Sequence, residues 1–244
     1  MRRQFPQDQA PWFEDIFDGL DAATTQALLD SGEEQVLEEG DRVPKLRDSL
    51  IRVEDGLVKV AVTSDDRNLC VGIYGPGDTI VAPLFDEWDD GLYFLEAQEQ
   101  TELLVIPQDT VLKIASGNPL FLKKLMRVQG QAQYQLMYAI RMLAFYNLPQ
   151  RVAQVLLNLA AMFGMPDQKR GVRLALRFTQ EELAEMAGAR RETLSTVLQD
   201  FREDDILDLR YARIDIRDFD ALCSLAGADP LPFLKNEKVF VGKS

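Results

Sequence analysis

The sequence has no histidine among its 244 residues, and this absence narrows the chemistry open to it. Histidine is the commonest metal ligand and the commonest general acid or base in proteins. A Ser-His-Asp mechanism, a Cys-His mechanism and a haem held by histidine are therefore excluded. Catalysis by other side chains is not excluded, but the residue that most often acts as general acid or base is missing. We predict a protein that is not an enzyme and holds no cofactor.

Cysteine is almost missing as well. Cys70 and Cys223 lie far apart and form no CxxC spacing, so neither a disulfide framework nor a zinc site is expected. No apolar run approaches the roughly 20 residues of a membrane span. The apolar stretch of a signal peptide does not follow Met1-Arg2-Arg3. These absences predict a cytoplasmic protein with no metal site and no membrane partner.

Positive charge is scarce, and the formal net charge is −13. Residues 1–148 carry 13 basic and 25 acidic side chains, whereas residues 149–222 carry 11 and 13. Even the second region is not basic overall, so any binding of nucleic acid there must depend on local clusters. Such clusters are formed by Arg190, Arg191, Arg210 and Arg213. We expect weak non-specific affinity, because an acidic body repels DNA unless the correct face is presented.

Residues 179–198 have the layout of a helix-turn-helix. Thr179 and Glu182 match a capping box at the start of one helix, and Gly188 supplies a residue that tolerates the turn. A second amphipathic segment follows. Taken alone, these residues also fit an ordinary helical hairpin in a protein core.

The next residues favour DNA binding. Residues 206–209 and 213–216 alternate apolar and polar side chains on either side of residues 210–212, which predicts a β-hairpin. A hairpin at this place is the wing of a winged helix-turn-helix, whose second helix enters the DNA major groove.

Before the helix-turn-helix, the spacing of the apolar residues indicates first strands and then a long helix. From Glu34 to about Ile106, many short alternating segments are broken by turns such as Gly75-Pro76-Gly77-Asp78, which predicts an all-β sandwich or barrel. From Pro119 to about Tyr146, apolar residues at steps of three and four predict one long helix. Asn147-Leu148-Pro149 ends that helix and marks a hinge.

The long helix has an apolar seam that is typical of a dimeric coiled coil. The same seam could instead pack on the protein's own β-domain, and different faces of the helix could do both. We favour dimerisation, because the helix is apolar on several faces. The predicted dimerisation residues are Leu122, Leu125, Ala132, Leu136, Ala139 and Leu143.

This order of elements resembles the Crp/Fnr family of transcription regulators over about residues 12–222. The motifs that carry the resemblance are residues 75–78, residues 179–184, Gly188 and residues 191–195. It implies an α+β protein with a β-roll sensor domain, a cupin-like jelly roll, at residues 1–118. A dimerisation helix at 119–147, a winged helix-turn-helix domain at 148–227 and an irregular tail at 228–244 would follow. Family members are homodimers that bind palindromic sites.

The resemblance also assigns roles on the second helix of the motif. Arg191, Glu192 and Thr193 match the family's helix start, where arginine contacts guanine and glutamate accepts from cytosine. Thr196 stands where arginine is usual, which forfeits about 1–3 kcal/mol of base discrimination. Arg190 replaces the usual Ser or Thr cap, which gives up about 1 kcal/mol. The predicted DNA-binding residues are Thr179, Gln180, Arg190, Arg191, Glu192, Ser195, Thr196 and Arg213.

The sensor half departs further from the family. Cyclic-nucleotide-binding members carry Gly-Glu where this chain has Val81-Ala82, and Arg-Ser or Arg-Thr where it has Gly91-Leu92. A buried cyclic phosphate without its arginine would be an unpaired charge, so we predict no cyclic AMP binding. A pocket lined by Val81, Ala82, Leu92 and Tyr93 would hold another metabolite or be filled by side chains. The candidates for such filling are Trp88, Tyr93 and Phe94.

Two functions remain open. The first is a homodimeric regulator that binds double-stranded DNA and contacts RNA polymerase, with an unidentified effector or none. The alternative is a metabolite-binding signalling protein that acts through a protein partner and keeps a vestigial helix-turn-helix. The acidic charge and Thr196 favour this alternative slightly. A β-barrel enzyme of the cupin type is disfavoured, because its metal needs histidines.

Overall fold

The computed structural model describes residues 15–43, 49–64, 67–81, 93–166, 171–210 and 213–227. The chain divides into two compact units, which meet in sequence between Tyr138 and Ala139. No helix in these described ranges is long and apolar enough to cross a membrane.

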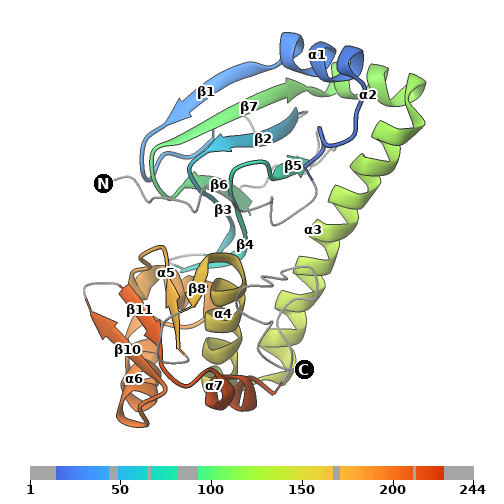
Figure 1. The fold of residues 1–244 in the computed structure, drawn as a ribbon. Coiled ribbons are helices and arrows are strands. Elements are labelled where there is room, and N and C mark those ends of the chain that lie inside the picture. The colour runs from blue at the N-terminus through green and yellow to red at the C-terminus, as the bar shows by residue number, and fades with distance from the viewer. Residues whose placement is uncertain are drawn as a thin grey trace. The chain divides into compact units, whose positions relative to one another are not determined.

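The first unit contains two antiparallel sheets (Figure 1). One has the order β1–β7–β2–β5, with β1 at Glu33–Leu37, β7 at Thr101–Pro107, β2 at Ser49–Asp55 and β5 at Thr79–Val81. The other has the order β4–β3–β6, with β4 at Arg67–Tyr74, β3 at Val58–Ser64 and β6 at Tyr93–Ala97. The predicted β-rich domain is confirmed.

The turn between β2 and β3 requires glycine. Gly56 has a φ of +88°, a backbone conformation that side chains disfavour. A Cβ atom at this position would also lie 2.7 Å from the Cα atom of Thr101. The close approach lets β7 start beside the turn, and the hydroxyl of Thr101 accepts from the N–H of Leu57 over 3.2 Å.

Three helices complete this part of the chain: α1 at Ala22–Ser31, α2 at Gln108–Gly117 and α3 at Pro119–Phe145. The side-chain oxygen of Asn118 accepts from the N–H groups of Leu120 and Phe121 and so caps α3. The start of α3 joins the core of the first unit, which comprises Ile16, Leu28, Leu50, Leu104, Ile106, Val111, Ala115 and Phe121. The long helix predicted from Pro119 to about Tyr146 is therefore confirmed.

The second unit is organised around α4 at Leu148–Phe163, which contacts α5, α6 and α7. Asn147 caps α4 through a capping box with Gln150. The other helices are α5 at Gln180–Ala187, α6 at Arg191–Glu203 and α7 at Phe219–Ala226. A four-stranded sheet has the order β10–β11–β9–β8, with strands at Leu207–Arg210, Arg213–Ile216, Val172–Leu174 and Gly164–Pro166. This is the predicted winged helix-turn-helix.

Candidate nucleic-acid interface

Helix α5 begins and ends where its sequence signals place it. The hydroxyl of Thr179 accepts from the N–H of Glu182 over 3.1 Å, and the carboxylate of Glu182 accepts from the N–H of Thr179 over 2.6 Å. At the other end, Gly188 has a φ of +60°. Leu183, Ala184 and Ala187 are buried, so the short turn brings α6 against α5.

Helix α6 presents one apolar and one polar face. Leu194, Val197, Leu198 and Phe201 are buried, and the first three residues of the helix, Arg191 to Thr193, are exposed. Arg190 occupies the cap position without a side-chain hydrogen bond, as predicted from its replacement of Ser or Thr. The start of the helix therefore offers two arginines and a glutamate to a partner.

The other predicted residues of the motif have distinct environments. Gln180 and Ser195 are half-buried and line the same hollow of about 490 Å³, together with Gln199 and Arg202. The hydroxyl of Thr196 is exposed but donates to the backbone carbonyl of Glu192 over 3.3 Å. The fold thus brings Gln180 beside α6, while the hydroxyl of Thr196 is engaged within its own helix.

The wing adds a second group of cations. Arg210 and Arg213 are cross-strand neighbours at the tip of β10 and β11. With Arg177, they line a hollow of about 500 Å³ that also includes Asp208 and Asp215. Arg213 is predicted from the sequence as a DNA-binding residue and Arg210 as part of a basic cluster, whereas Arg177 is not. Arg177 precedes α5 and is far from the hairpin in sequence, so no local pattern joins it to the wing.

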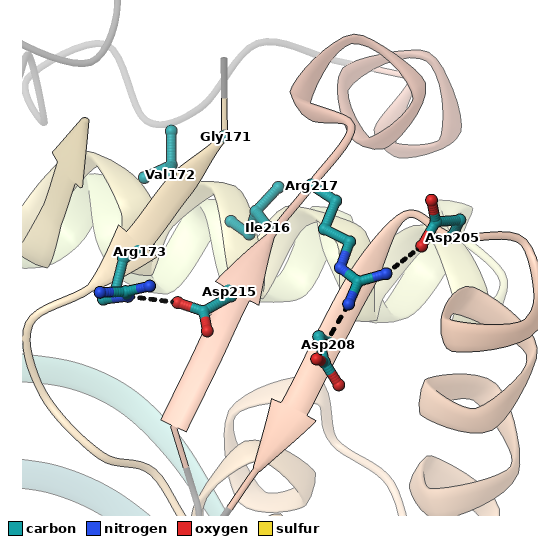
Figure 2. Close-up of a pocket in the computed structure, with 8 residues that line it drawn as sticks. All are labelled: Gly171, Val172, Arg173, Asp205, Asp208, Asp215, Ile216 and Arg217. Carbon is teal, nitrogen blue, oxygen red and sulfur yellow. Dashed lines mark hydrogen bonds and ion pairs between the residues drawn. The ribbon is translucent and has the colours of Figure 1, made fainter. Parts of the chain in front are cut away.

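Asp208 pairs with several arginines of the second unit, and Figure 2 shows its contact with Arg217. Although Asp208 lies on β10 and is only 6% exposed, its carboxylate accepts from Arg210 Nε over 2.8 Å and from Arg217 Nη2 over 3.0 Å. Arg217 also pairs with Asp205, and Arg173 pairs with Asp215 over 2.6 Å. Burial acts to raise the pKa of Asp208, but Arg210, Arg217 and Arg202 outweigh it, so the pKa is lowered.

Several arginines of the second unit are thus held in ion pairs, and the arginines outside these pairs can bind an anionic partner. Among the described residues, Arg177, Arg190, Arg191 and Arg213 form no ion pair, and all four are exposed. The cations available to an anionic partner therefore lie before α5, at the start of α6 and on the wing.

The predicted effector pocket is only partly described. Val81 ends β5 and Tyr93 begins β6, and both side chains are half-buried. Ala82, Leu92 and the candidate filling residue Trp88 lie outside the described residues. Phe94 is buried beneath Arg42, whose guanidinium carbon lies 3.6 Å from the ring centroid. Because neighbouring residues of a strand face opposite ways, Phe94 and Tyr93 belong to different faces of the sheet.

Helix α3 carries an apolar stripe that the chain itself leaves exposed. Met126, Met137 and Ile140 are 70%, 61% and 66% exposed. Of the predicted dimerisation residues, Leu122, Leu136 and Leu143 are also exposed, whereas Leu125, Ala132 and Ala139 are half-buried. Leu125 packs against the core of the first unit. Met126, Met137 and Ile140, the most exposed members of the stripe, are not among the predicted residues.

The comparisons with known sequences point to one class of protein. The model of the Crp-like helix-turn-helix domain matches residues 150–225. The chain is 28% identical over 186 residues to the transcriptional regulator SdrP of Thermus thermophilus, covering 75% of this chain and 87% of that protein. It is 29% identical over 185 residues to the CRP-like cAMP-activated global transcriptional regulator of Mycobacterium tuberculosis, covering 73% and 80%.

Solved structures agree. A mutant of CooA from Carboxydothermus hydrogenoformans superposes with a TM-score of 0.70 at 25% identity, over 81% of this chain and 89% of that one. A CRP/FNR-family regulator from Thermus thermophilus gives a TM-score of 0.63 at 26% identity, over 80% and 99%. The predicted fold class, a β-rich domain followed by a long helix and a winged helix-turn-helix, is confirmed.

Proposed function

We propose that the chain is a transcription regulator of the Crp/Fnr family, whose members it resembles in sequence and fold, and that it binds palindromic promoter sites as a homodimer without cyclic AMP. The start of α6 carries the DNA-reading part of this proposal. Arg190 and Arg191 are exposed there and form no ion pair with any described residue, and Glu192 is exposed beside them.

Each of these groups has a natural partner on DNA. The guanidinium of Arg191 is suited to guanine O6 and N7, and the carboxylate of Glu192 accepts from cytosine N4. Gln180 and Ser195, which line one hollow next to α6, supply further polar groups. Arg190, Arg177 before α5 and Arg213 on the wing contact phosphates. Thr179, exposed at the start of α5, and Thr196 complete the interface.

The stripe on α3 supports the homodimer. Exposed methionine, leucine and isoleucine side chains along one helix face gain free energy by burial against a second copy. Two copies joined in this way present two α6 helices, which suits half-sites about 34–36 Å apart. A palindrome follows from the two-fold symmetry of such a dimer.

Independence from cyclic AMP rests on the sensor sequence. Val81 and Ala82 stand where the nucleotide-binding members carry Gly-Glu, and Gly91 and Leu92 stand where they carry Arg-Ser or Arg-Thr, whose arginine pairs with the cyclic phosphate. The cAMP-activated relative from Mycobacterium tuberculosis is thus not a guide to this chain's effector. As a regulator of promoters, the protein acts in the cytoplasm and contacts RNA polymerase.

Selection of duplexes from a random pool tests the DNA-reading proposal. The purified full chain is mixed with the pool at low salt, with and without cyclic AMP and with and without cell-extract metabolites. We expect an enriched palindrome that does not depend on cyclic AMP. Failure to enrich any motif under all conditions would favour the alternative, a signalling protein that acts through a protein partner.

Matched double substitutions then test the residues. Arg191→Ala with Glu192→Ala removes one cationic and one acidic contact per half-site, and we expect specific binding to the enriched duplex to be lost. Lys113→Ala with Glu34→Ala changes the same two charges at exposed positions of the first unit and serves as the control. Equal operator affinity of the two variants would contradict the assignment of α6 as the DNA-reading helix.

A further inference from the structure

Arg151 lies near the start of α4 and makes hydrogen bonds with carbonyl groups from two other parts of the second unit. Its Nε donates to the carbonyl of Ala187 over 2.8 Å, and its Nη2 donates to that of Gly188 over 3.4 Å. Its Nη1 donates to the carbonyl of Tyr146 over 3.1 Å. One planar side chain therefore joins the end of α5 to the hinge that follows α3.

The carbonyls at the end of α5 need such a donor. The last carbonyls of a helix have no partner within the helix, and they carry the negative end of its dipole. The N–H groups of Gly188 and Ala189 bond further back, to Glu185 and Ala184. The guanidinium of Arg151 supplies hydrogen bonds and positive charge to two further carbonyls at this end, those of Ala187 and Gly188.

Tyr146 forms hydrogen bonds through its N–H, its hydroxyl and its carbonyl group. It follows the last residue of α3, and its N–H donates to the carbonyl of Met142 over 3.2 Å. Its hydroxyl accepts from Arg141 Nη2 over 2.8 Å. Its carbonyl accepts from Arg151. Two arginines thus connect the last turns of α3, the hinge and the turn between α5 and α6.

We propose that Arg151 is a positioning residue for DNA recognition, because it fixes the turn that precedes α6 relative to the end of the dimerisation helix. Gly188 lies two residues before Arg190, so a shift of its carbonyl is passed to the start of α6 through a short, turned segment. This inference rests on the proposed function, since it concerns how the same helix is aimed at two half-sites.

Specific and non-specific DNA binding depend differently on the orientation of α6. Specific binding needs both α6 helices of a dimer to meet bases at a set spacing, so it depends on the orientation of α6. Non-specific binding needs only exposed cations near phosphates, and Arg151 provides none of these. A loss of orientation therefore lowers the specific affinity and leaves the non-specific affinity unchanged.

Arg151→Lys is the first test variant, because lysine keeps the charge but cannot span three carbonyls with a planar fork. Fluorescence anisotropy measures the affinity of the full chain for the enriched duplex and for a scrambled duplex at the same salt concentration. We expect the ratio of specific to non-specific affinity to fall roughly 2- to 30-fold, the range seen for residues that transmit coupling. Arg151→Gln serves as the second variant if the lysine form melts below the assay temperature.

Arg52→Lys is the matched control. Arg52 is a partly buried arginine of β2 that donates to Asp15 over 2.8 Å and to Glu54 over 2.5 Å, within the first unit. We expect it to lower the melting temperature without changing the affinity ratio. An equal change of the ratio in both variants would mean that lost stability explains the effect, and it would overturn the proposal.

A double-mutant cycle gives a readout that a merely structural role does not move. If Arg151 acts through the placement of α6, Arg191→Ala costs less specific affinity in the Arg151→Lys background than in the wild type. Additive effects would overturn the proposal. If the wild type enriches no duplex, the proposed function fails. If the wild type binds specifically and depends on Arg191 but not on Arg151, only this inference fails.

Discussion

Substitution of Ile140 by glutamate provides the sharpest test of the α3 stripe. Full burial of an isoleucine side chain contributes about 1.5–3 kcal/mol. Ile140 is 66% exposed in the single chain. Covering this remainder in a dimer therefore contributes about 1–2 kcal/mol per chain and about 2–4 kcal/mol for both copies.

The substitution removes this contribution, and it also places a carboxylate on each copy against an apolar surface. A loss of about 2–4 kcal/mol raises the dimer dissociation constant by about 30- to 700-fold, since each 1.4 kcal/mol is about tenfold. The fold of the single chain is unaffected, because the side chain that is replaced is exposed. Analytical ultracentrifugation over a concentration series measures the dissociation constant, and circular dichroism measures the melting of the fold.

Lys123→Glu is the control. Lys123 is exposed on the same helix and lies about 100° around it from Ile140 by helical periodicity. We expect this variant to dimerise nearly as well as the wild type. The reasoning is refuted if Ile140→Glu and Lys123→Glu dimerise equally, because the stripe would then not form the interface. A wild-type chain that stays monomeric at all concentrations would refute the homodimer itself.

Two further predictions concern buried polar contacts. Tyr74 donates to the side-chain oxygen of Gln135 over 2.8 Å, so Tyr74→Phe should lower the free energy of unfolding by about 1–3 kcal/mol by orphaning that oxygen. Gln135→Met in the same chain should recover part of this loss in chemical denaturation, and a Tyr74→Phe variant as stable as the wild type would contradict it. Because the folded-state pKa of Asp208 is lowered from 3.8, its carboxylate stabilises the fold above that pH, and this stabilisation is lost as the pH falls through the lowered pKa. The difference in unfolding free energy between the wild type and Asp208→Asn should therefore shrink as the pH falls below about 4, and a constant difference would refute the pairing.

The helix-turn-helix and its wing could be predicted because short-range interactions specify them. Thr179 and Glu182 bond each other across three residues, and Gly188 takes the backbone conformation that ends the helix. The strands at Leu207–Arg210 and Arg213–Ile216 follow from alternation over four residues each. The long helix from Pro119 likewise follows from its period. In each case, the residues that decide the conformation lie within one or two turns of each other.

Contacts between distant residues escaped prediction. Strands β5 and β6 lie within the region of short strands predicted from Glu34 to about Ile106, but no local pattern indicated that β5 pairs with β2 and β6 with β3. Arg177 joins the wing cations only after folding. Asp208, which reads as a polar residue of a half-buried strand, becomes the common partner of Arg210 and Arg217.

The sequence by itself determined the classes of element and the chemistry at the start of α6, since capping, alternation and side-chain type are local properties. Because the sequence has no histidine, it also excluded catalysis and metal binding by histidine. Periodicity could not decide which part of the α3 seam the chain covers. The tertiary structure packs Leu125 against the core and leaves Ile140 exposed, because burial depends on which surface lies opposite. Tertiary structure alone also brought Arg151 to Ala187 and Gly188, 36 and 37 residues away in sequence, where unpaired helix-end carbonyls needed a donor.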